Sequence, residues 1–74
     1  MSKKYELTTE TKQFNGITLY RIKALITFSS IVSGTLGGFI EKETNLTQDG
    51  NAWVYGNALV YGNAWVYGNA LCST

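Results

Sequence analysis

Residues 50–73 read GNAWVY, GNALVY, GNAWVY and GNALCS, which are four consecutive hexads with almost no drift. A period of six is a multiple of the two-residue period of a β-strand, so each hexad directs equivalent side chains to the same side. Within a hexad, Ala, Trp or Leu, Val and Tyr form a short extended run. Gly-Asn supplies the corner, because both residues tolerate the positive φ of a sharp bend. The stretch predicts an all-β structure made of short repeated strands.

Side-chain size indicates which residues of each hexad face inward. The Trp and Tyr side chains would crowd a narrow core, whereas small and β-branched side chains fill one well. We therefore place Val inside together with the Ala two positions before it. The same pattern continues upstream, with two extra residues near Gln48 and Asp49. The predicted inward aliphatic positions are Ile40, Leu46, Val54, Val60, Val66 and Cys72, and their small partners are Gly38, Thr44, Ala52, Ala58, Ala64 and Ala70.

Inward aliphatic residues at every sixth position, each with a small residue two before it, resemble the hexapeptide repeats of left-handed parallel β-helices. The GNA-x-VY repeats follow residues 37–46, which read GGFIE-x-E-x-NL, and this combination resembles small hexapeptide-repeat proteins of phages and prophages. The resemblance implies a short left-handed parallel β-helix of about two turns, with three hexads in each triangular turn. The first turn would hold Ile40, Leu46 and Val54, and the second Val60, Val66 and Cys72.

A meander of short antiparallel strands is the alternative arrangement of the hexads, because Gly-Asn is also a hairpin-turn signal. Strands of about four residues, all in the same register and with bulky aromatic side chains on one face, would make a poor sheet. The pattern therefore favours the β-helix over the meander.

Residues 1–35 lack the repeat and predict a cap. Residues 5–9 and 17–25 have the composition of strands, and Asn15-Gly16 between them is a strong hairpin signal. An uncovered β-solenoid end exposes unpaired backbone groups and core side chains. We therefore expect an N-terminal β-hairpin cap and connector over residues 1–35 and a hexapeptide-repeat β-solenoid over residues 36–74, in one folding unit. The residues expected to cover the first turn are Ile17, Leu19, Ile22 and Leu25.

Composition argues against several classes of protein. The net charge is +1, with six basic and five acidic residues, which gives no electrostatic case for direct nucleic-acid binding. Cys72 is the single cysteine, so the chain forms no internal disulfide, and a reducing compartment is indicated. Residues 24–40 carry no charge, but their Ser, Thr and Gly content makes a poor membrane span. The N-terminus has no signal-peptide pattern, and we expect a protein of the bacterial host cytoplasm.

Catalysis finds no support in the residue types. Many left-handed β-helix proteins transfer acyl groups with a histidine as general base, and this chain has no histidine. Cys72 has no base partner in sequence, and one Cys without His leaves only scattered carboxylates as metal ligands. We predict a non-enzyme with no catalytic residue, cofactor or metal. A degenerate hexapeptide acyltransferase fragment is the alternative in the enzyme class.

The outward side chains form the candidate binding surface. Contiguous exposed aromatic residues mark interaction sites, and the C-terminal edge would present open N–H and C=O groups. We predict a non-enzymatic protein-binding or assembly module of phage type, which binds itself, preferably as a dimer, or a host or phage protein. The alternative is a phage-encoded inhibitor of a host defence nuclease, as anti-CRISPR proteins are. The candidate residues are Trp53, Tyr55, Leu59, Tyr61, Trp65, Tyr67 and Leu71.

Overall fold

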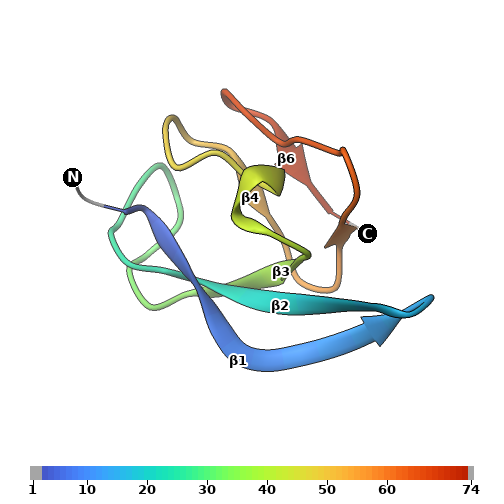
Figure 1. Ribbon diagram of the computed structural model, residues 1–74. Helices are drawn as coiled ribbons and strands as arrows, with labels where there is room; N and C mark the ends of the chain where they lie inside the picture. The colour runs from blue at the N-terminus through green and yellow to red at the C-terminus, as the bar shows by residue number, and fades with distance from the viewer. Residues whose placement is uncertain (1–2, 74) are drawn as a thin grey trace.

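The computed structural model describes residues 3–73, which form β structure with one short 3₁₀ turn (Figure 1). This confirms the predicted β class. The elements are β1 (Tyr5–Phe14), β2 (Ile17–Ala24), β3 (Leu36–Ile40), the 3₁₀ turn η1 (Glu43–Asn45), β4 (Trp53–Val54), β5 (Leu59–Val60) and β6 (Leu71–Cys72).

Strands β1 and β2 form the predicted N-terminal hairpin. They pair antiparallel up to Phe14 opposite Ile17, with one irregularity between Leu7 and Thr11. The turn residues Asn15 and Gly16 have φ of 50° and 82°. Positive φ at both central residues is what a tight two-residue hairpin turn requires, and Asn-Gly adopts it at low cost. The local signal in the sequence was therefore sufficient to place this hairpin.

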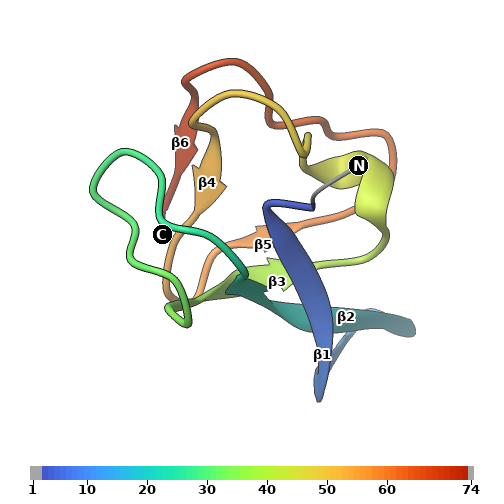
Figure 2. The same ribbon diagram turned by 90° about the vertical axis from the view of Figure 1, so that its left-hand side faces the viewer.

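The hexads pair in parallel, so the antiparallel meander is not the arrangement they adopt. Strand β3 pairs in parallel with β5, β4 pairs in parallel with β6, and an isolated parallel bridge joins Leu46 to Val66. Figure 2 shows β2, β3 and β5 following one another on one side of the molecule, with β4 beside β6 on another. Residues 36–55, which we name the first coil, are thus paired along their length with residues 56–73, the last coil.

The spacing of the parallel partners reflects the two extra residues predicted near Gln48 and Asp49. Ile40 pairs with Val60, 20 residues further along, whereas Val54 pairs with Cys72, 18 residues further along. Only the first of these intervals contains the extra residues. The insertion is accommodated without loss of the parallel pairing on either side of it.

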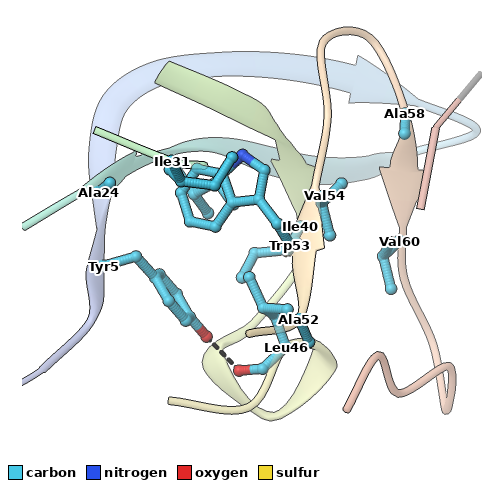
Figure 3. Packing of buried hydrophobic residues seen from close by; sticks show 11 residues of the cluster. Tyr5, Ala24, Ile31, Ile40, Leu46, Ala52, Trp53, Val54, Ala58 and Val60 are labelled. Carbon is cyan, nitrogen blue, oxygen red and sulfur yellow. Dashed lines mark hydrogen bonds between the residues drawn. The ribbon is translucent and has the colours of Figure 1, made fainter. Parts of the chain in front are cut away.

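The N-terminal third covers the first coil on the side away from the last coil. Strand β2 pairs antiparallel with β3, and the Phe28 ring packs edge-on against Trp53 at a centroid distance of 5.4 Å. The Lys4 Nζ donates to the Ala52 carbonyl at 2.7 Å, and the Tyr5 hydroxyl donates to the Leu46 carbonyl (Figure 3). Backbone and side-chain contacts together therefore close this end of the first coil.

The four residues expected to form this cover differ in burial. Leu19 and Ile22 are fully buried and Ile17 is half-buried, but Leu25 is 37% exposed. The expectation for Leu25 was wrong, because it follows the last residue of β2, where the chain leaves the sheet for the loop of residues 25–35. The loop covers the first coil through Phe28 and Ile31 instead.

The predicted inward aliphatic positions are buried throughout the first coil and at Val60, and become partly exposed later in the last coil. Ile40, Leu46, Val54 and Val60 are buried. Val66 and Cys72 are half-buried and pack against the same core. The loss of burial follows the chain into the last coil, whose far side has no further layer of described residues against it.

Three of the predicted small inward positions are exposed, which corrects the sequence-based assignment. Thr44 lies within η1, and that turn rotates Asn45 inward in its place. The buried Asn45 amide donates to the Gly62 and Ala64 carbonyls at 3.2 and 2.8 Å. Ala64 and Ala70 are exposed because nothing in the described chain packs beyond them, whereas Ala58, earlier in the last coil, is buried.

Gly38 shows why the first coil needs a residue without a side chain at one inward position. A Cβ atom there would lie 2.7 Å from the Ala58 carbonyl oxygen and 2.7 Å from the Val54 Cγ1. These distances are far shorter than normal van der Waals contacts. The close approach of the two coils at this point therefore depends on glycine.

Candidate protein-binding surface

Trp53 was predicted to be exposed, and the structure corrects this prediction. Strand alternation does place the Trp53 ring on the opposite side of β4 from Val54 (Figure 3). The ring is nevertheless 0% exposed, because Tyr5 and Phe28 pack against it edge-on with centroids 6.4 and 5.4 Å away. The N-terminal third supplies a second apolar layer that covers this face. Trp53 is therefore a core residue and no part of an exposed binding surface.

The remaining candidates divide between half-buried and exposed positions. Tyr55 and Leu59 are half-buried. Four side chains are clearly exposed, and all of them belong to the last coil: Tyr61 at 39%, Trp65 at 59%, Tyr67 at 57% and Leu71 at 61%. We name these four residues the last-coil surface. The structure thus retains four of the seven predicted residues as well-exposed apolar side chains.

Two aromatic contacts order the last-coil surface. The rings of Trp65 and Tyr67 stack with centroids 4.4 Å apart and planes inclined by 28°. The ring of Phe14, at the tip of the hairpin, lies 5.3 Å from that of Tyr61. Phe14 was missed by the sequence analysis, because nothing local indicates that the hairpin tip reaches a residue 47 positions later. Pre-stacked rings lose little conformational entropy on binding, which favours their use as anchors.

The backbone of the last coil presents free edges beside these rings. The Val60 carbonyl accepts from the Glu41 N–H, and Val66 bonds to Asn45 and Thr47 through its own N–H and carbonyl. In a parallel ladder, alternate residues direct their backbone groups to opposite sides. Leu59 therefore directs its N–H and C=O away from the first coil. By the same alternation, Leu71 in β6 does so as well.

Charge is absent from the whole segment that carries these edges. All six basic and all five acidic side chains lie between Lys3 and Asp49, so residues 50–74 contain none. The other edge strand of the four-stranded sheet, β1, carries charged residues including Glu6, Glu10 and Lys12. Proteins use charges, Lys above all, and Pro to protect an edge strand from pairing with another chain. Strand β1 has such protection and the last coil has none.

The described residues provide no enclosed site for a small ligand. Residues 3–73 contain no pocket and no cluster of three or more His, Cys, Asp or Glu side chains. Within the same range, no helix has the length and hydrophobicity needed to cross a bilayer. A surface of exposed apolar rings beside free β edges suits a protein partner better than a small molecule.

No family model matches the chain. The chain is similar to a protein of Escherichia coli (strain K12) named "Uncharacterized acetyltransferase YdcK", with 37% identity over 61 residues. The alignment covers 72% of this chain and 19% of that protein, so the chain spans about a fifth of the length of the relative it matches. This similarity gives no support to the phage or prophage origin that the sequence resemblance implied.

Proposed function

We propose that this protein is a non-enzymatic assembly module, a short left-handed parallel β-helix that binds another protein through its last coil. The observation that supports the proposal most directly is a coincidence of features in residues 56–73. Exposed stacked rings, free backbone edges and a complete lack of charge occur together there, and only there among the described residues.

The mode of binding follows from these features. A partner strand that adds to the edge of β5 or β6 would satisfy the outward N–H and C=O groups of Leu59 and Leu71, as in other cases of β-augmentation. Trp65 and Tyr67 would supply the buried aromatic area that usually dominates the binding free energy. The main-chain bonds would give affinity, and the rings would select the partner.

A second candidate function is favoured by the similarity to the protein named as an acetyltransferase. In this alternative the chain is a structural unit of an acyl-transferring assembly, and further β coils from a larger protein cover the last coil. The chain has no histidine, which such enzymes of the resembling family use as general base. It would therefore contribute a scaffold rather than the reacting groups.

The test common to both candidates is whether the last coil accepts another coil. A chain lengthened at its C-terminus by a second copy of residues 56–73 would be compared with the original chain by amide hydrogen exchange in NMR, at a concentration low enough for both chains to be monomeric. The Leu59 and Leu71 amides should become protected in the longer chain, and its free energy of unfolding should rise.

The matched control carries the same appended residues in scrambled order, so that composition and length stay the same. Protection of Leu59 and Leu71 in the repeat extension but not in the scrambled one would support the assembly function. Equal and fast exchange of both amides in all three chains would contradict it.

A further inference from the structure

The two ends of the coiled region differ in a way that limits how copies of this chain can meet. At one end, the first coil is covered by the pairing of β2 with β3, by Phe28 on Trp53, and by the Lys4 and Tyr5 hydrogen bonds. At the other end, no layer of residues 3–73 packs against the last coil. A second copy therefore has no free first-coil end to offer to the last coil of its neighbour.

From this we infer that the chain forms a closed two-fold dimer, in which the last coil of one copy packs against the last coil of the other. The inference rests on the proposed function and names a second copy of the chain as the partner. Head-to-tail stacking would build open fibres, and the cover over the first coil blocks it. When both copies use the same surface, the interface joins two copies and no more. The N-terminal thirds that cover the first coils then lie at the two far ends of the dimer.

The chemistry of the last coil is compatible with such self-pairing. Like charges that face each other across an interface are costly, and residues 50–74 have no charge to oppose. The Glu41 carboxylate of the first coil reaches the last coil, where it is engaged as the acceptor of the Gly62 N–H at 2.8 Å. A two-fold axis places an edge strand antiparallel to the same strand of the second copy. The outward N–H and C=O groups of Leu59 can therefore form hydrogen bonds with those of the second copy.

The dimer would extend a sheet that already exists. The four-stranded sheet has the order β1-β2-β3-β5, with β1 at the charged edge and β5 at the uncharged one. Antiparallel pairing of β5 with its copy would make one continuous eight-stranded sheet, in which both outer edges are the protected β1 strands. Such an arrangement removes the unprotected edge of each copy.

The first experiment measures the mass of the full chain in solution by light scattering over a wide range of concentrations. A mass twice that of the 8.2 kDa chain, which stays constant at high concentration, is expected. A monomer at every concentration, or a mass that keeps growing, would overturn the dimer. If the protein is monomeric while the repeat extension protects Leu59 and Leu71, the assembly function stands and the partner is another protein.

A matched pair of variants places the interface. Leu71 and Val32 are exposed to the same degree, 61% and 62%. Leu71 lies in the last coil, whereas Val32 lies in the loop of residues 25–35, the covering loop, which packs over the first coil. Leu71→Lys should give a monomer, because it puts a charge on each side of the two-fold contact, and Val32→Lys should remain a dimer. A dimer that survives Leu71→Lys, or that both substitutions weaken equally, would contradict the inference. Circular dichroism shows whether each variant is folded, and Trp65→Lys replaces Leu71→Lys if the latter is not.

Spin labels test the orientation of the two copies. In a Cys72→Val background, single labels at Asn63→Cys in the last coil and at Ser30→Cys in the covering loop each report one intermolecular distance. The distance for Asn63→Cys should be the shorter of the two, because the last coils meet and the covers lie apart. The opposite order would show that the copies associate through their covers and would overturn the inference.

Discussion

The same six residues, GNAWVY, occur at positions 50–55 and 62–67, yet the two copies have opposite environments. Ala52, Trp53 and Val54 in the first copy are fully buried. In the second copy Ala64 is exposed, Val66 is half-buried, and Trp65 has 59% of its surface in solvent. Identical local sequence therefore fixes the backbone corner in both places. It leaves burial undetermined, and only the first copy forms a strand, β4, whereas the second makes a single parallel bridge at Val66.

The difference comes from residues far away in the sequence. The first copy has the last coil on one side and the N-terminal third on the other, where Tyr5, Phe28 and Lys4 contact it. For the second copy, the described backbone contacts with another coil lie on the first-coil side, where Val66 bonds to Asn45 and Thr47. Burial in a repeat structure depends on the number of neighbouring layers, so a coil with a layer on one side only is where core positions become surface. Three paired substitutions test this comparison.

The largest effect is expected for the two tryptophans. Trp53→Ala should lower the free energy of unfolding by about 3–5 kcal/mol, because it removes a large, fully buried side chain and leaves a cavity. Trp65→Ala should change it by about 0.5 kcal/mol or less in the monomer, as is usual for an exposed position. Chemical denaturation followed by circular dichroism, at a concentration where the chain is monomeric, measures both. Similar losses for the two variants would show that Trp65 is packed in solution and that the comparison is wrong.

The corner glycines of the two hexads, Gly50 and Gly62, test the same difference in environment through the cost of replacing each by alanine. Gly50 and Gly62 have φ of 72° and 64°, so alanine at either position adopts a left-handed conformation at a cost of about 1–2 kcal/mol. At Gly50 the added Cβ would also lie 2.6 Å from the Gly68 carbonyl oxygen, whereas at Gly62 it would meet nothing within 4 Å. We expect Gly50→Ala to be the more destabilising by about 1–3 kcal/mol in thermal or chemical denaturation. A loss for Gly62→Ala as large as that for Gly50→Ala would contradict the assigned contact between the coils.

The smallest expected effect concerns the cover and alkaline pH. Burial, with a further contribution from the charge of Glu43, raises the pKa of Tyr5 above its ordinary value. The unfolded chain releases this proton above about pH 10 while the folded chain keeps it, so stability should fall as pH rises beyond that point. Tyr5→Phe should remove this fall. It should also cost about 1–3 kcal/mol at neutral pH, because the Leu46 carbonyl loses its buried donor.

The control for this prediction is Tyr67→Phe, which changes an exposed tyrosine and should leave stability at neutral pH unchanged. Lys4 must be considered in the same pH range, because burial lowers its pKa, against a smaller opposing effect of Asp49. Deprotonation of Lys4 makes stability rise with pH up to the ordinary lysine pKa, since the unfolded chain binds more protons there. The free energy of unfolding is therefore measured against pH, between about pH 9 and 12, for wild type and Tyr5→Phe. The difference between the two slopes gives the contribution of the Tyr5 hydroxyl alone. Parallel slopes would refute the role given to its hydroxyl.

Much of the fold could be predicted because its signals are local. Asn15-Gly16 specified the hairpin, and the six-residue period specified short strands with Ile40, Val54 and Val60 inside. The candidate surface was predicted less well. Trp53 was placed in it because alternation reports which side of a strand a residue faces, and not what covers that side. Phe14 was left out because its contact with Tyr61 depends on where the hairpin tip lies in space.

The sequence by itself determined the β class, the hairpin, the corners at Gly-Asn and the position of the two extra residues, since each of these depends on neighbours along the chain. Only the tertiary structure decided which coil is covered and which is open. That outcome depends on Lys4, Tyr5 and Phe28, which belong to no repeat and meet the hexads through contacts more than twenty residues away in sequence. Strand period and turn propensity are properties of a segment, whereas burial is a property of the layers that surround it.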